Sequence, residues 1–142
     1  MKYLLDTCVI SELIAKNTES RVVDWIDDVD DQLISLSVIT IGAIKQGIEK
    51  LPESDRKERL NNWLSDELLI RFDQRILGID LPAMLKWGEL VAGLEGKGRS
   101  LPAIDSLIAA IALTKELQLV TRNEKDFAGT GVETVNPWEK EG

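Results

Sequence analysis

The stretch Leu101-Pro102-Ala103-Ile104-Asp105-Ser106-Leu107-Ile108-Ala109-Ala110-Ile111-Ala112-Leu113 is among the most apolar in the chain, yet it contains a carboxylate. Such a stretch predicts a helix that is buried on most sides. An ionised carboxylate in that setting is unfavourable unless a cation, a hydrogen-bond donor or a metal compensates it. Asp105 is therefore the first candidate for a functional residue.

The sequence around this helix predicts an α/β fold. Short apolar runs typical of buried parallel strands occupy 3–5, 33–36, 75–79 and 117–121, with a last short strand at 133–135. Helical patterns lie between them, at 9–15, 19–29, 41–51 (capped by Thr40 and ended by Pro52), 54–69 and 82–93. This alternation implies right-handed crossovers and a central parallel sheet between two helical layers, a three-layer α/β/α arrangement. The 142 residues contain no repeat or linker, so we predict a single domain over 1–142.

The composition excludes several kinds of chemistry. The chain has no histidine, one cysteine and a net charge of -8. Without histidine, Ser-His-Asp catalysis, Cys-His catalysis and the common zinc ligand sets are excluded. Carboxylate oxygens remain, and they suit Mg²⁺ or Mn²⁺. The negative charge opposes a general polyanion-binding surface, so contact with nucleic acid would need a local basic path or a metal bridge.

The same sequence bears on location. Its apolar runs are shorter than the roughly 20 residues that a membrane span needs. The first residues, Met1-Lys2-Tyr3-Leu4-Leu5-Asp6, lack the apolar region of a signal peptide. We therefore expect a cytoplasmic protein without membrane contact.

Polar residues follow two of the predicted strands. Asp6 comes directly after the first strand, Thr121 and Asn123 come after the fourth, and Asp105 lies near the start of the helix that precedes the fourth. In parallel α/β folds, ligands bind beyond the carboxyl ends of the strands. If the strand order places these elements side by side, their polar groups converge on one edge of the sheet, as a metal site requires.

Each acidic residue also has a purely structural interpretation. Asp6 can cap the first helix, and Asp105 can be stabilised by the positive end of its own helix. Asp126 can belong to a turn before Phe127. These interpretations are as good as the functional ones for each residue alone, but three such acids on one edge of the sheet favour a metal site.

Several stretches also carry a resemblance to a known family. They are Leu5-Asp6-Thr7-Cys8-Val9-Ile10-Ser11-Glu12, Ser37-Val38-Ile39-Thr40-Ile41-Gly42, Leu101-Pro102-Ala103-Ile104-Asp105-Ser106-Leu107-Ile108-Ala109, Leu119-Val120-Thr121-Arg122-Asn123-Glu124-Lys125-Asp126-Phe127 and Val135-Asn136-Pro137-Trp138. In order and spacing they resemble the PIN domains, specifically the VapC toxins. The resemblance implies a PIN fold, Mg²⁺- or Mn²⁺-dependent RNA cleavage, a homodimer and neutralisation by a small VapB-type antitoxin.

The resemblance also implies roles for individual residues. The metal-site carboxylates would be Asp6, Asp105 and Asp126, and the polar supports of metal-bound water or substrate phosphate would be Thr121 and Asn123. Ser11 and Glu12 match family positions whose role is less defined. Cys8 stands where many relatives have asparagine, and we interpret it as a packing residue rather than a nucleophile.

One position departs from the family pattern. After Thr40-Ile41-Gly42 the family has a glutamate that supplies a fourth carboxylate, and this chain has Ala43. Fewer carboxylates attract a divalent ion less strongly. We therefore expect a nuclease scaffold with weakened activity. The sequence leaves open whether Ala43 is natural or introduced.

Three classes of function remain open. The first is the metal-dependent endoribonuclease, with Lys45, Lys97, Arg99 and Arg122 as candidates to guide RNA, although ordinary solvated charge is the commoner role for each. The second is a non-catalytic module that binds an antitoxin or nucleic acid. The third, ranked last, is a phospho-receiver domain, which expects paired acids at the first strand and a late lysine.

Overall fold

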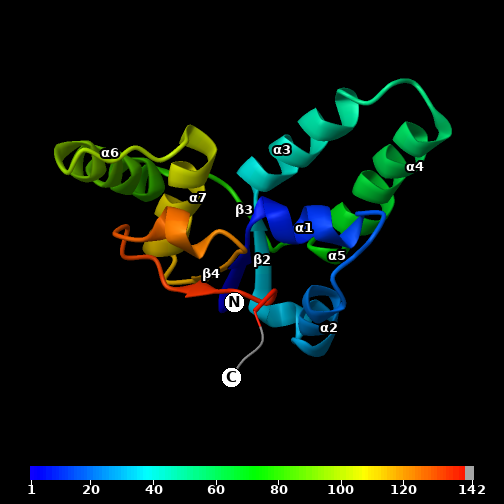
Figure 1. The fold of residues 1–142 in the computed structure, drawn as a ribbon, viewed down its shortest axis with the longest axis horizontal. Helices are drawn as coiled ribbons and strands as arrows, with labels where there is room; N and C mark the ends of the chain where they lie inside the picture. Colours follow the sequence, from blue (N-terminus) through cyan, green and yellow to red (C-terminus); the bar gives the residue numbers. More distant parts are fainter. Residues whose placement is uncertain (140–142) are drawn as a thin grey trace.

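The first strand of the chain lies in the middle of its sheet. In the computed structural model, which describes residues 1–139, β1 (Tyr3–Leu5) pairs in parallel with β2 (Ile34–Ser37) on one side and β4 (Gln118–Val120) on the other. The edges are β3 (Ile76–Leu77) and β5 (Thr134–Val135), also parallel, in the order β3-β2-β1-β4-β5. The predicted central parallel sheet is confirmed (Figure 1).

Helices cover both faces of this sheet (Figure 1). One face carries α6 (Leu81–Gly96) and α7 (Ala103–Thr114). The other face carries the remaining helices, which are α1 (Thr7–Leu13), α2 (Ser20–Asp28), α3 (Val38–Glu49), α4 (Asp55–Trp63) and α5 (Leu69–Arg71). Two short 3₁₀ turns, Asp31–Leu33 and Glu124–Phe127, complete the elements. The arrangement is the three-layer α/β/α fold that the alternation of strands and helices predicts.

Alternate residues of the central strands build two separate cores. Leu4 and Leu119 are paired in register and both pack under α6 and α7. Leu5 and Val120, the next pair, belong to the core under α1 to α5. Because neighbouring residues of a strand point to opposite faces, strands covered on both sides are apolar throughout. This double burial fixes the register of β1 and so the place where Asp6 leaves the sheet.

Two local predictions were wrong. The helix expected to start after Thr40 begins at Val38, because the hydroxyl of Ser37 accepts the backbone N–H of Thr40 (3.1 Å) and caps it. The helix expected over 54–69 starts as predicted, with Ser54 as its cap, but changes to a π-helical turn at Leu64–Leu68. In that turn Leu64 and Leu68 are buried, and sequence periodicity does not show such a change.

The strand order separates this fold from the receiver alternative. Receiver-like sheets have the order 2-1-3-4-5, whereas here the second strand along the chain lies between the third and the first. The phospho-receiver hypothesis is therefore wrong. Within the described residues, no helix is long and apolar enough to cross a membrane.

Candidate functional site

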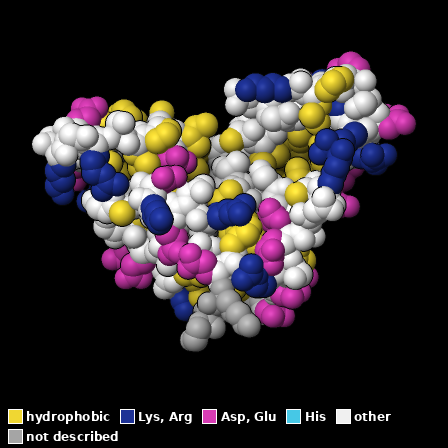
Figure 2. All heavy atoms as spheres, in the orientation of Figure 1, with side chains coloured by type: hydrophobic (Ala, Val, Ile, Leu, Met, Phe, Trp, Pro, Cys, Tyr) yellow, Lys and Arg dark blue, Asp and Glu magenta, His cyan; other side chains and the backbone are white. Residues whose placement is uncertain are grey.

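The strand order creates a switch point at β1. From there the chain builds the sheet outward in one direction through β2 and β3, and in the other through β4 and β5. In open parallel sheets, such a reversal leaves a crevice at the carboxyl ends of the strands, where ligands bind. Figure 1 shows the carboxyl end of β2 leading into α3, and Figure 2 shows the surface hollowed between the α6–α7 side and the α3–α4 side.

Asp6 leaves the sheet at this switch point. It is the N-cap of α1 and only 4% exposed. Its Oδ1 accepts the backbone N–H of Thr7 (2.8 Å), and its Oδ2 accepts the hydroxyl of Thr121 (2.8 Å), which follows β4. Burial raises the pKa of Asp6, and these two hydrogen bonds oppose the shift. The carboxylate therefore has a fixed orientation, and the capping role and a functional role are compatible.

Asp105 lies in the first turn of α7 and is less buried than the sequence predicts. The preceding residues 102–104 are exposed, and Asp105 itself is half-buried, so the expectation of a helix buried around this residue was wrong for its first turn. Burial raises the pKa of Asp105, and the negative charges of Asp6 and Asp126 raise it further. The carboxylate has no hydrogen-bond or ion-pair partner among residues 1–139, so its oxygens are free for a ligand.

Asp126 belongs to the exposed 3₁₀ turn Glu124–Phe127 that follows β4. Its backbone N–H donates to the carbonyl of Asn123 (2.9 Å). This contact fits the structural role in a turn that the sequence also allows for Asp126. Its negative charge also contributes to the raised pKa of Asp6 and of Asp105. Asp126 therefore acts electrostatically on both of the other acids while it remains exposed itself.

The side chains of the candidate site can be compared with the ligands that a divalent cation requires. Every donor is an oxygen, and within the described part of the chain no lysine or arginine forms an ion pair with any of the three acids. In that same part, no three acidic or cysteine side chains are grouped closely enough to enclose a metal ion. Mg²⁺ usually keeps several waters and binds through one or two carboxylates. The residues therefore fit a largely hydrated Mg²⁺ or Mn²⁺ rather than a closed cage.

The other predicted residues surround Asp6. Thr121 is fully buried, and its hydroxyl also accepts the backbone N–H of Asn123 (3.1 Å), so it orients both Asp6 and the following turn. Asn123 is exposed beside this turn. The Cys8 Sγ lies 3.8 Å from Asp6 Oδ2 and 3.7 Å from Thr121 Oγ1. Burial, followed by the charge of Asp6, raises the pKa of the Cys8 thiol, which favours packing over nucleophilic chemistry.

Ala43 lies on α3, at a cavity between α1, α3 and α4. It lines this cavity of about 200 Å³ together with Thr7 and Ser11 of α1, and Arg56 lies at its α4 side, whereas the three acids do not line it. Glu12 instead serves the fold, because its Oε1 accepts the backbone N–H of Glu19 (2.6 Å) just before α2. The link between Ala43 and the acidic residues is therefore Thr7, which follows Asp6 in the chain and shares the cavity with Ala43.

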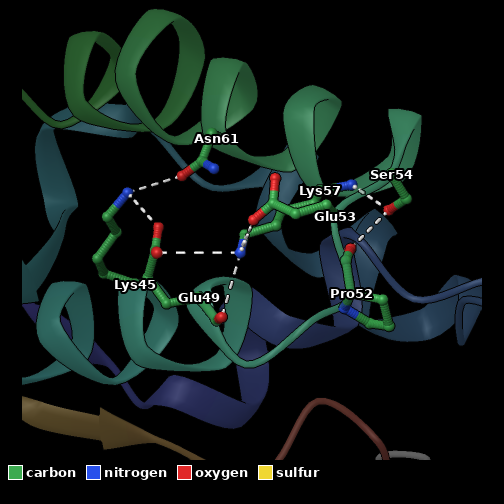
Figure 3. Close-up of polar contacts among 7 residues, drawn as sticks. All are labelled: Lys45, Glu49, Pro52, Glu53, Ser54, Lys57 and Asn61. Atoms are coloured by element: carbon green, nitrogen blue, oxygen red, sulfur yellow. Dashed lines mark hydrogen bonds and ion pairs between the residues drawn. The ribbon is translucent and has the colours of Figure 1, made fainter.

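The candidate RNA-guiding residues differ in how they are engaged. The ammonium of Lys45 on α3 pairs with Glu49 of the same helix (3.0 Å). It also donates to Asn61 Oδ1 on α4 (2.8 Å), and this hydrogen bond joins the two helices (Figure 3). Arg99 donates to the carbonyl of Ala128, close to the turn that carries Asp126. The guanidinium of Arg122 lies 5.7 Å from the centre of the Trp138 ring. Arg122 also lines a surface hollow with Asn123 and Asp126, Arg99 is bonded near the same turn, and Lys45 is committed to helix packing.

One feature was missed from the sequence. Ser37, Thr40 and Thr7 form a chain of hydroxyl contacts between the starts of α3 and α1. The signal was the presence of hydroxyl residues directly after the first two strands. The sequence does not show that β1 and β2 are neighbours, so it does not predict that these hydroxyl groups meet.

Comparison with known proteins agrees with this geometry. The PIN domain model matches residues 3–132. The plasmid stability protein StbB of Pseudomonas syringae pv. tomato is 35% identical over 136 residues, covering 96% of this chain and 98% of its own. The VapC ribonuclease Y4jK of Sinorhizobium fredii is 32% identical over 136 residues, covering 96% and 97%.

Solved structures give the same result. The crystal structure of FitAcB from Neisseria gonorrhoeae matches with a TM-score of 0.93 and 32% identity, covering 97% of this chain and 99% of the other. VapBC2 from Rickettsia felis, bound to a DNA fragment from their promoter, matches with a TM-score of 0.80 and 27% identity, covering 96% and 98%. The resemblance seen in the sequence is therefore confirmed, and the chain belongs to the PIN domain family, in its VapC-type branch.

Proposed function

We propose that this protein is a toxin of the VapC type, an endoribonuclease that needs Mg²⁺ or Mn²⁺ and is weakened by Ala43. The observation that supports the proposal is electrostatic: the charges of Asp6 and Asp126 raise the pKa of Asp105, and no lysine or arginine among the described residues pairs with these acids. Acids that repel one another in a partly buried place are costly to the fold, and a divalent cation relieves that cost. Similarity to a VapC ribonuclease supports RNA as the substrate.

Each residue has a definite task in this proposal. Asp6 is held by Thr121 and by the backbone of Thr7, so it would be a fixed ligand. Asp105 and Asp126 would be adjustable ligands on either side of it. A bound divalent cation would neutralise the scissile phosphate and make an attacking water more acidic. Asn123, exposed on the turn after β4, is available to hydrogen-bond the phosphate.

The substrate must approach an acidic protein. The net charge is -8, so long-range attraction of RNA is absent. Arg122 and Arg99 lie beside the site, with Lys97 in the loop before α7, and they supply a short basic path. Because the path is short, we expect binding through a few phosphates and a shallow dependence of RNA affinity on salt.

Ala43 leaves a space where the family has a carboxylate. The methyl group at position 43 lines the cavity with Thr7 and offers no oxygen to an ion. We therefore propose weak ion binding in this chain. The same apolar cavity favours a second candidate function, a non-catalytic module whose site region receives a segment of an antitoxin. The two candidates differ in whether glutamate at position 43 restores ion binding.

We also propose two protein partners. The similar VapBC2 structure supports a small VapB-type antitoxin as one of them. The other is a second copy of this chain. The α6–α7 side of the molecule carries exposed apolar side chains (Figure 2), and those of these two helices are Leu81, Met84, Leu85 and Ile104. Patches of this kind on a soluble domain mark interaction sites, and the family resemblance favours a homodimer there.

The homodimer can be tested at Leu85, which is 62% exposed. We expect Leu85→Glu to shift the purified protein from dimer to monomer in sedimentation velocity, because a charge in an apolar interface lacks a partner. Ile70→Glu is the matched control, since Ile70 is 67% exposed but lies outside the patch. A parent chain that sediments as a monomer at all concentrations, or equal effects of both variants, would contradict the proposed interface.

Calorimetry tests the metal site itself. Mn²⁺ is titrated into this chain and into Ala43→Glu, and we expect the variant to bind about tenfold tighter, because ligand charge tunes the affinity of oxygen sites. Equal weak binding by both would contradict the metal site. If that result came together with a tight complex between the parent chain and an arginine-bearing antitoxin segment, the non-catalytic module would be the better account.

A further inference from the structure

A chain of buried hydroxyl groups joins the two helix starts that border the candidate site. The hydroxyl of Ser37 donates to Thr40 Oγ1 (3.4 Å), and Thr40 Oγ1 lies 3.2 Å from Thr7 Oγ1. Ser37 and Thr40 are both fully buried. Since buried hydroxyl groups are costly without partners, these contacts define the packing of α3 against α1.

Two of these hydroxyl residues, Thr7 and Thr40, lie close in the sequence to positions of the proposed metal site. Thr7 follows Asp6 directly, and its backbone N–H donates to Asp6 Oδ1 (2.8 Å). Position 43 follows Thr40 by three residues on α3, so the two side chains lie on the same face of the helix. Thr7 and Ala43 line the same cavity, which places residue 43 on the α1 side of α3.

The Ser37 hydroxyl donates to Thr40 Oγ1, and either hydroxyl of the Thr40–Thr7 pair can donate to the other. When Thr40 donates, the Thr7 proton is left for the cavity that Ala43 lines. In that arrangement a carboxylate at position 43 would meet a donor rather than another acceptor.

We infer that Thr40 is a positioning residue, which uses the Ser37–Thr40–Thr7 contacts to hold α3 so that residue 43 faces the metal site beside Asp6. The inference rests on the proposed function, because it assigns Thr40 a role toward the same ion. Thr40 touches neither ion nor RNA. Its effect passes through the placement of position 43, so it is visible only when that position carries a ligand.

A cycle of variants tests this role. Mn²⁺ affinity is measured by calorimetry for four proteins. They are the parent chain, Ala43→Glu, Thr40→Val and the double variant that carries both substitutions. With threonine at position 40, we expect Ala43→Glu to tighten Mn²⁺ binding about tenfold. With valine at position 40, we expect a gain of less than about threefold, as is typical when a supporting contact of a ligand is lost. Thr40→Ser keeps the hydroxyl and should retain the full gain.

Controls separate positioning from general stability. Thr114→Val removes a hydroxyl that bonds the Ala110 carbonyl (3.0 Å) within α7, and it should leave the gain intact. Thermal unfolding is followed for every variant, because a merely structural Thr40 would lower the melting temperature yet leave the ratio of affinities unchanged. If Thr40→Val does not fold, Thr7→Val breaks the same contact from a half-exposed residue.

The possible results distinguish the two hypotheses. If Ala43→Glu tightens Mn²⁺ binding equally with threonine and with valine at position 40, the positioning role of Thr40 is overturned. The metal site itself is then still supported. No gain in either background would overturn the metal site and, with it, the role of Thr40. A gain that falls in Thr40→Val and returns in Thr40→Ser would support both.

Discussion

Ala43→Glu is expected to raise Mn²⁺-dependent RNA cleavage about a hundredfold over the parent chain. Removing one electrostatic stabiliser from an active site typically costs roughly 10²–10³ in rate, and the substitution restores one. The side chain would extend into the cavity shared with Thr7, the residue that follows Asp6. The measurement is cleavage of a labelled structured RNA with Mn²⁺, with and without EDTA.

A matched control isolates position 43 from the added charge. Gln46→Glu places the same new charge on α3 one turn further on, at an exposed position. It should leave cleavage unchanged. Cleavage by Ala43→Glu that persists in EDTA, or cleavage no faster than that of the parent chain, would refute the proposed mechanism.

Asp105→Asn is expected to act in opposite directions on activity and stability. In the Ala43→Glu background it should lower Mn²⁺-dependent cleavage about a thousandfold, roughly 4 kcal/mol of transition-state stabilisation. The amide can still accept a hydrogen bond but carries no charge for the ion. Asp27→Asn on the exposed face of α2 is the control, and it should have no effect on cleavage.

Without metal, the same substitution should stabilise the protein at neutral pH. Burial and the charges of Asp6 and Asp126 raise the pKa of Asp105 above its ordinary 3.8, so the folded state binds its proton more tightly than the unfolded state. That contribution to stability is present at low pH and is lost as the pH rises through the raised pKa. The positive end of α7 favours the ionised form by only about 0.3–1 kcal/mol, and burial and the charges of Asp6 and Asp126 act against it.

The size of this effect is modest because Asp105 is half-exposed and screened by solvent. We expect Asp105→Asn to melt about 2 °C above the parent at pH 7 in EDTA, as a change below 1 kcal/mol would give in a chain of this length. The difference should shrink as the pH falls below 4. Adding Mn²⁺ should raise the melting temperature of the parent more than that of the variant. A variant that melts lower than the parent at pH 7 would contradict the proposed repulsion.

The sequence is sufficient to predict the parallel α/β fold because β1 and β4 are apolar on both faces and are separated by helical patterns. It does not determine that β1 lies between β2 and β4, since strand order depends on long-range pairing. The hydrogen bond from Thr121 to Asp6 could therefore be proposed only conditionally. Thr40 was taken for a helix cap because its type and position suit that role, and only the geometry of Ser37 shows the difference.

The exposure of Asp105 was also beyond prediction from local pattern. Apolar composition indicates that α7 is buried, but it does not show that residues 102–104 at its start are exposed. The π-helical turn at Leu64–Leu68 is similar, because it is a local adjustment that buries two leucines without changing the composition. These features depend on tertiary packing, which overrides local preference.

The pairing of β1 with β4 has a consequence for the timing of synthesis. Asp6 and its partner Thr121 are separated by 115 positions in the chain. During synthesis, Asp6 would leave the ribosome exit tunnel long before Asp105, Thr121 or Asp126. Contacts between residues so far apart in the sequence form late in folding. If the protein has the proposed function, the nascent polypeptide would therefore lack its metal site until nearly all of it has been translated.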